Sequence, residues 1–201
     1  MNKPLSVVIV AFYTIVRIVA DPIIWQNVSE YYSYAVDVAF VGITYFLFRH
    51  EIRFAKRPTL FDALFSLLTL ISGFLIFKMA SLFQIPIPFD FSSTETLVLL
   101  LLLGPLLEEL IFRMALWQAL KNICLNKWFV IGATSLLFAV AHFAPYWAVP
   151  EQFHSFIIYQ TIYVMFLGLA VGVRRSISHA VLPAVFVHIG FNLGFFLASQ
   201  V

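Results

Sequence analysis

The sequence predicts an all-α fold, a polytopic transmembrane helix bundle of about seven helices. Of its 201 residues, 62% are hydrophobic and only 11% are charged, and the mean hydropathy is +0.97. Apolar stretches long enough to cross a bilayer recur along the chain. Because backbone facing lipid must satisfy its own hydrogen bonds, such stretches are expected to be helices.

Seven apolar segments are predicted to be these helices: 5–20, 34–48, 60–83, 97–120, 128–143, 156–173 and 181–199. The first resembles a signal peptide, but Arg17 interrupts its apolar region, so we expect a retained helix. Residues 23–33 are expected to form an interfacial loop. Ile-Pro-Ile-Pro at 85–88 cannot continue a helix, and residues 92–95 offer capping side chains for the fourth segment.

The rest of the composition narrows the class of protein. Without an evident internal repeat, residues 1–201 are expected to form a single integral membrane domain. One cysteine, Cys124, excludes an internal disulfide and is too few for a cysteine metal site. The sequence has no Lys/Arg-rich arm, so nucleic acid is not an expected partner and membrane lipids are.

Positive charge is distributed unevenly between the loops. With the N-terminus in the cytoplasm, the outside loops hold no Lys or Arg, as the positive-inside rule requires. We therefore expect seven helices with the N-terminus inside and the C-terminus outside, and we interpret Arg174-Arg175 as a basic turn. The inside cations are Lys3, Arg49, Arg53, Lys56, Arg57, Lys121, Lys127, Arg174 and Arg175.

The fourth segment carries three charged residues near its middle, Glu108, Glu109 and Arg113. A charge at the bilayer centre costs roughly 2.5–3.5 kcal/mol, so it needs a partner or a function. Glu109 and Arg113 are four apart on one helical face and are predicted to form a structural ion pair. Glu108 lies about 100° away and is predicted to be the working group. Pro105 is expected to free backbone carbonyls nearby.

Later segments carry His142, His188 and Asn192. A lone histidine in an apolar helix is more often a packing residue than a catalyst. Three such groups together with an unpaired glutamate make convergence on one cavity the more natural outcome. Arg17 and Asp37 could pair across helices, although ordinary packing polarity is an equal interpretation.

Three motifs occur in order on successive segments: EExxxR from Glu108 through Glu109 to Arg113, FxxxH ending at His142, and HxxxN joining His188 to Asn192. This set resembles the CPBP (CAAX protease and bacteriocin-processing, or Abi) family of intramembrane proteases. The resemblance covers about 97–197, a family-like catalytic core, and departs at Met114, where many members have glycine. It implies an intramembrane endopeptidase acting on membrane-associated, including lipidated, peptides.

Two mechanisms fit these residues. In the preferred one, Glu108 is the general base that activates water, His142 shares the water, and His188 and Asn192 donate to the oxyanion. No metal or other cofactor is then needed. In the alternative, zinc is held by His142, His188 and Glu108, which leaves no obvious base. The absence of HExxH disfavours zinc.

Two other functions stay open. One is a non-catalytic membrane scaffold or bacteriocin immunity factor, which the intact polar set disfavours. The other is a proton-coupled transporter, which the lack of a repeat disfavours. We expect a multi-pass protein of a bacterial inner membrane that meets its peptide or protein substrate in or at the membrane.

Overall fold

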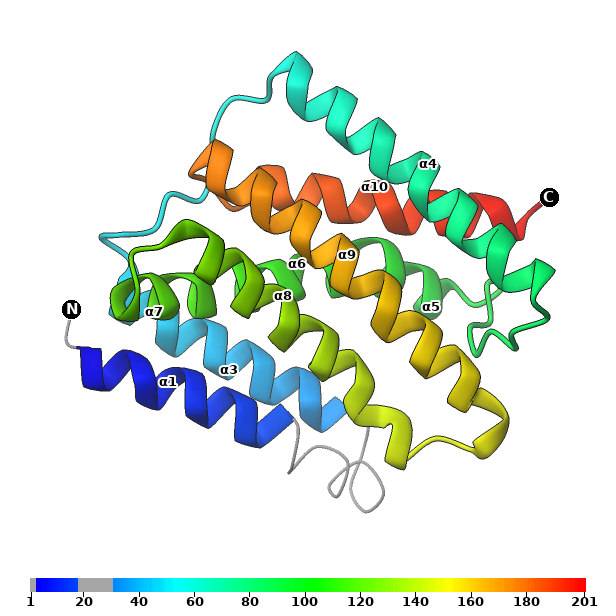
Figure 1. Cartoon of the computed structure of the whole chain (residues 1–201), viewed down its shortest axis with the longest axis horizontal. Coiled ribbons are helices and arrows are strands. Elements are labelled where there is room, and N and C mark those ends of the chain that lie inside the picture. Colours follow the sequence, from blue (N-terminus) through cyan, green and yellow to red (C-terminus); the bar gives the residue numbers. More distant parts are fainter. Residues whose placement is uncertain (1–2, 18–30) are drawn as a thin grey trace.

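The computed structural model describes residues 3–17 and 31–201, which form seven helical segments in chain order (Figure 1). Six are α1 (Lys3–Ile15), α3 (Tyr31–Phe48), α4 (Leu60–Leu82), α8 (Lys127–Phe143), α9 (His154–Ser178) and α10 (Leu182–Ser199). The remaining one is built from α5 (Thr94–Val98), η2 (Leu99–Leu103), α6 (Gly104–Glu109), η3 (Leu110–Ala115) and α7 (Leu116–Ile123). Two short 3₁₀ turns, η4 (Ala144–Trp147) and η5 (Glu151–Phe153), separate α8 from α9.

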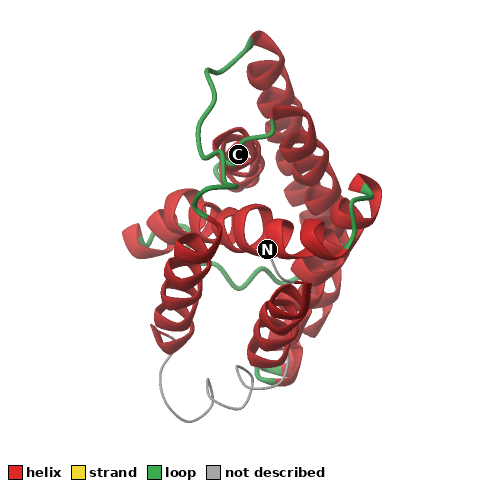
Figure 2. Ribbon diagram, turned by 90° about the vertical axis from the view of Figure 1, so that its left-hand side faces the viewer, coloured by secondary structure: helices red, strands yellow, loops and turns green. Residues whose placement is uncertain are grey.

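The described part of the chain contains helices and loops but no strand (Figure 2). Four segments are long and apolar enough to cross a membrane: Leu60–Leu82, Lys127–Trp147, Glu151–Ser178 and Leu182–Ser199. The protein is therefore an integral membrane protein with an all-α bundle, as predicted. α1 and α3 are shorter apolar helices, so their crossing of the membrane stays a prediction.

The segment α5–α7 runs through the centre of the bundle between α10 above it and α1 and α3 below it (Figure 1). Its N-terminus is capped by Ser93, whose hydroxyl accepts from the Thr96 N–H at 3.3 Å, within the predicted capping stretch. η2 and η3 are π-helical, which sequence periodicity did not indicate. π-Helical turns inside α-helices are frequent at functional sites.

Glycines allow α4 and α10 to pack in direct backbone contact. A Cβ at Gly73 would overlap the carbonyl oxygen of Phe191, and one at Gly194 would overlap that of Leu70. Thr69 adds a hydrogen bond from its hydroxyl to the Val187 carbonyl at 2.9 Å. Small residues serve this purpose in membranes, where association depends on close packing rather than on the hydrophobic effect.

The prediction of a basic turn at Arg174-Arg175 is wrong, because α9 continues to Ser178. Both arginines are buried inside the bundle. Arg174 pairs with Asp62 of α4, and the Arg175 Nε donates to the Arg113 carbonyl at 3.0 Å. These partners let the helix retain two cations that a hydropathy pattern assigns to a turn. Of the predicted loop 23–33, residues 23–30 lie outside the described residues, and the remainder belongs to α3.

Candidate active site

A cavity of about 450 Å³ lies among α1, α3, α6, α8, α9 and α10. Its lining includes all four residues to which the sequence analysis gave chemical roles: Glu108, His142, His188 and Asn192. The predicted convergence of these side chains is therefore present in the structure. Their catalytic roles stay a prediction.

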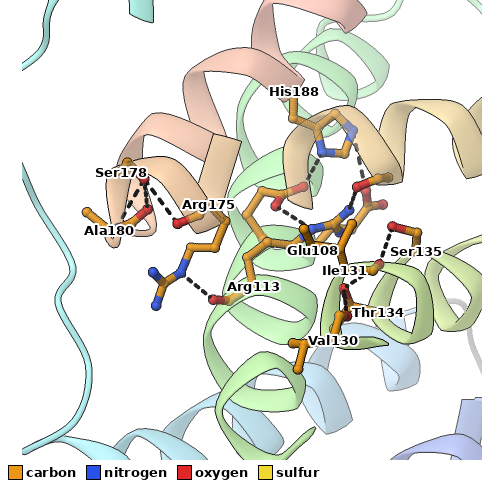
Figure 3. A network of polar contacts seen from close by, with 12 residues as sticks. Glu108, Arg113, Val130, Ile131, Thr134, Ser135, Arg175, Ser178, Ala180 and His188 are labelled. Atoms are coloured by element: carbon orange, nitrogen blue, oxygen red, sulfur yellow. Dashed lines mark hydrogen bonds and ion pairs between the residues drawn. The ribbon is translucent and has the colours of Figure 1, made fainter. Parts of the chain in front are cut away.

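Glu108 lies between the two imidazoles. Its Oε1 is 3.8 Å from His142 Nε2. Its Oε2 is 3.6 Å from the Nε2 of His188, which lies beside Glu108 in Figure 3. The Glu108 side chain is 31% exposed, whereas that of His188 is 4% exposed. Both distances exceed a direct hydrogen bond. The carboxylate thus stands at the cavity surface with an imidazole nitrogen beside each oxygen.

Glu109 is fully buried and faces two partners. Its Oε2 is 3.3 Å from Arg113 Nε, in agreement with the predicted pair. Its Oε1 is 2.8 Å from His188 Nδ1, a contact that the sequence analysis did not foresee. Glu109 therefore supports His188 as well as Arg113, so the strict division between a structural and a working glutamate is too simple.

Arg113 is completely buried, and α9 supplies a second anchor for it. Its Nη2 donates to the Gly168 carbonyl at 2.9 Å, and its guanidinium carbon lies 5.0 Å from the centre of the Phe138 ring. A Cβ at Gly168 would come within 3.3 Å of that Nη2 and 3.1 Å of the Ser135 Cβ. Glycine at this position thus lets α8, α9 and the Arg113 side chain meet.

The histidine of the FxxxH motif, His142, is held in place by the phenylalanine of the same motif, Phe138. His142 Nδ1 lies 3.0 Å from the Phe138 carbonyl oxygen, and the two rings meet edge to face at 4.5 Å. Since a carbonyl oxygen only accepts, the hydrogen of a neutral His142 belongs on Nδ1. Nε2 then presents its lone pair toward Glu108.

Asn192 is fixed by the irregular backbone around Pro105. The Gly104 N–H bonds to the Leu99 carbonyl, and Pro105 has no N–H to give. The Leu100 carbonyl is therefore open, and Asn192 Nδ2 donates to it at 2.7 Å. Pro105 does free a carbonyl near the site, as expected, and Asn192 is its partner.

The sequence analysis did not place any N-terminal residue in the site. Tyr13, Arg17 and Asp37 also line the cavity. Arg17 Nη1 is 3.7 Å from Asp37 Oδ2, so the pairing across helices, one of two open interpretations, is present. The signal available in the sequence was an ionisable residue within each of two apolar segments.

A three-ligand zinc site requires one carboxylate oxygen and two imidazole nitrogens about 2.0–2.2 Å from one point. Among the residues that the structure describes, no group of three His, Cys, Asp or Glu side chains is arranged to hold a metal ion. Glu108 instead directs separate oxygens toward His142 and His188. The choice between a metal-free site and zinc stays a prediction.

Fold and site together define an all-α integral membrane protein whose helices enclose a carboxylate flanked by imidazoles. The chain belongs to the type II CAAX prenyl endopeptidase Rce1-like family, because the model of that family matches residues 90–194, more than half of the 201 residues. The family indicates a protease. The match includes all three motifs and leaves out α1, α3 and α4. Comparisons with curated proteins and with solved structures each returned no match.

Proposed function

We propose that the protein is an intramembrane endopeptidase that hydrolyses peptide bonds of membrane-associated, including lipidated, substrates. The observation that carries this proposal is Glu108 at the cavity surface, 3.8 Å from His142 Nε2 and 3.6 Å from His188 Nε2. A carboxylate beside imidazoles in a low-dielectric cavity provides the general acid and base that peptide hydrolysis requires. Membership of a protease family supports the same reaction class.

In the proposed mechanism a water lies about 2.8 Å from both Glu108 Oε1 and His142 Nε2, a normal hydrogen-bond length to each. Glu108 accepts one proton as the water oxygen attacks the peptide carbonyl. The tetrahedral intermediate then breaks its C–N bond. Glu108 gives this proton to the departing amine, either directly or through His142 Nε2, which accepts it from Glu108 and passes it on, so the carboxylate is restored when the products leave.

The oxyanion needs donors on the other side of the reacting carbonyl. A side-chain amide nitrogen carries two hydrogens, so Asn192 Nδ2 can donate one to Leu100 and the other to the oxyanion. A protonated His188 donates from both ring nitrogens. Its Nδ1 is then directed to Glu109 and its Nε2 to the substrate.

Hydrolysis is tested with the purified protein in detergent and a panel of fluorescence-quenched apolar peptides. Mass spectrometry of the products identifies the bond that is cleaved. We expect cleavage by the wild type and none by Glu108→Gln at an unchanged melting temperature. The proposal is contradicted if the wild type cleaves no peptide of the panel, or if the wild type and Glu108→Gln cleave the peptides equally.

The choice between a metal-free site and zinc is tested separately. In the metal-free mechanism, activity survives dialysis against a strong chelator, since Glu108 needs only a water between itself and His142. In the zinc alternative, with His142, His188 and Glu108 as ligands, chelation abolishes activity and zinc alone restores it. That second result would reassign Glu108 from base to ligand.

We further propose a bacterial inner membrane as the location, with the N-terminus in the cytoplasm and membrane lipids as the surrounding partners. The exposed cations between α3 and α4 support this orientation, because they would face the cytoplasm; they are Arg49, Arg53, Lys56 and Arg57.

A further inference from the structure

The cavity that holds Glu108 extends to one end of the bundle, which we call the open end. Its lining there comes from the start of α3, the loop before α5, the turn after η4 and the first turns of α9: Tyr34, Pro88, Ala148 and Gln160. The ring centres of Phe89 and Phe156 lie 5.5 Å apart, so this loop and α9 meet at the cavity wall. Figure 1 shows the loops after α4 and α8 on the right-hand side of the bundle. Tyr34 and Pro88 are exposed, which places the mouth of the cavity at this end.

The opposite end of the bundle, the closed end, has no such opening. Residues 111–120 of the central segment are all buried, whereas Pro105 is the only buried residue from 94 to 108. None of the described residues in the three loop regions of the closed end lines the cavity; these regions are 49–59, 121–127 and 174–181. A route to Glu108 is therefore present at the open end, and the closed end offers none.

Exposed cations gather at the closed end, on the left-hand side of Figure 1. They are Lys3, Arg49, Arg53, Lys56, Arg57, Lys121 and Lys127. The loops of the open end, 83–93 and 144–153, contain no Lys or Arg. Because cationic loops are retained in the cytoplasm, the closed end faces the cytoplasm in the proposed orientation. The mouth of the cavity then faces the other side of the membrane.

Glu108 lies deep below this mouth. Thr96 is the first residue of the central segment that lines the cavity, and the helical stretch from Thr96 to Glu108 is about 18 Å long at ~1.5 Å per residue. A carbonyl inside a helix is bonded to its own chain, so a peptide bond open to attack belongs to extended chain. At about 3.3 Å per residue, roughly five or six residues of an extended peptide span this depth.

We propose that the substrate is a peptide segment on the non-cytoplasmic side of the membrane, which enters the open end in an extended conformation. This inference rests on the proposed peptidase function and on the proposed orientation of the bundle. The substrates are then peptides, or segments of membrane proteins, that have already crossed the membrane. Cytoplasmic peptides are excluded, because the closed end gives them no route to Glu108.

The side of the opening is tested without catalysis, by labelling single cysteines in a Cys124→Ser background with a charged, membrane-impermeant methanethiosulfonate. Ala141 of α8 lines the cavity, so Ala141→Cys should be labelled in right-side-out vesicles and not in inverted ones. Leu136→Cys is the matched control, because Leu136 is 55% exposed on the same helix and does not line the cavity. In lipid it should react from neither side. Ala148→Cys, at the mouth, should follow Ala141→Cys.

Entry of the substrate is tested with fluorescence-quenched apolar peptides that carry biotin at one end. Bound streptavidin keeps each peptide on the side where it is added and cannot enter the cavity. Right-side-out vesicles with the wild type should cleave a peptide with about ten residues between biotin and the cleaved bond, and should lose this activity with about three. Inverted vesicles should cleave neither until detergent is added, and Glu108→Gln should cleave neither in any preparation.

Labelling of Ala141→Cys and Ala148→Cys from the inverted side, or of neither cysteine from either side, overturns the proposal whatever the activity. So does cleavage of the tethered peptide by inverted vesicles alone, or in detergent alone. Absence of cleavage in detergent as well counts against the peptidase function, and the side of the opening is still decided by the labelling.

Discussion

At the scale of single residues, His188 lies between the two glutamates and faces one with each ring nitrogen. Its Nδ1 contacts buried Glu109, and its Nε2 faces half-buried Glu108. Orientation of an imidazole by a carboxylate on its far nitrogen is a general device for fixing its tautomer. The neighbouring glutamates can therefore differ in function although they are adjacent in sequence, because one faces the cavity and the other faces the bundle interior.

This contrast predicts different results for two equal substitutions. Glu108→Gln should abolish hydrolysis at unchanged stability, because it removes the base and keeps the shape. Glu109→Gln should lower the free energy of unfolding by roughly 3–5 kcal/mol, because it leaves buried Arg113 without a counter-charge. It should also reduce turnover through His188. Melting temperature and peptide cleavage are measured for both, and equal loss of activity with unchanged stability in both would contradict the assignment.

Asn192 offers a second test at this scale. Asn192→Ala should lower kcat about 10²–10³-fold if it removes an oxyanion donor, and it also leaves the Leu100 carbonyl unbonded. Thr69→Val is the matched control, since it removes a hydrogen bond of α4 to the α10 carbonyl of Val187 outside the cavity. The control should lose stability and keep kcat. A similar fall in kcat for both variants would reduce Asn192 to a packing role.

The contacts of these residues were predictable only in part. Spacing of four predicted the Glu109–Arg113 pair and the shared face of His188 and Asn192, because such pairs depend on one helix. The Glu109–His188 contact joins α6 to α10, and it depends on how these two helices are rotated against each other. No local pattern carries that information, so only the structure could reveal it.

At the scale of elements, α4 and α10 pack closely because glycines at their contact have no side chain. Their glycines remove the atoms that would keep the backbones apart, so a single methyl group should act as a wedge. The sequence analysis assigned Gly194 no role. GxxxG at 190–194 was the available signal.

Gly194→Ala should therefore lower the free energy of unfolding by about 1–3 kcal/mol or more, the range for overpacked cores. Gly132→Ala in α8 is the control, because no atom lies within 4 Å of a Cβ built there. The control should be neutral or more stable by up to about 1 kcal/mol, since alanine favours a helix. Thermal unfolding in detergent distinguishes them, and equal melting temperatures would show that α4 can shift without cost.

At the scale of the whole molecule, the order of the helices followed from hydropathy, whereas the composition of the cavity did not. Each apolar segment can be recognised from the hydropathy of one continuous stretch of sequence. The cavity joins Arg17 and Asp37 to Glu108 and His142, which come from distant segments. The N-terminal helices, which lie outside the family match, thus contribute to the wall of the site.

The final prediction concerns the orientation of the whole bundle. Cys124, the only cysteine of the sequence, lies between α7 and α8, on the side that the positive-inside rule assigns to the cytoplasm. A membrane-impermeant maleimide should label Leu125→Cys in a Cys124→Ser background only in inverted vesicles, because Leu125 is 86% exposed at this turn. Gln152→Cys, in the exposed 3₁₀ turn η5 before α9, should be labelled only in right-side-out vesicles. Labelling of both from one side would rule out a membrane crossing by α8, and the reverse pattern would place the N-terminus outside.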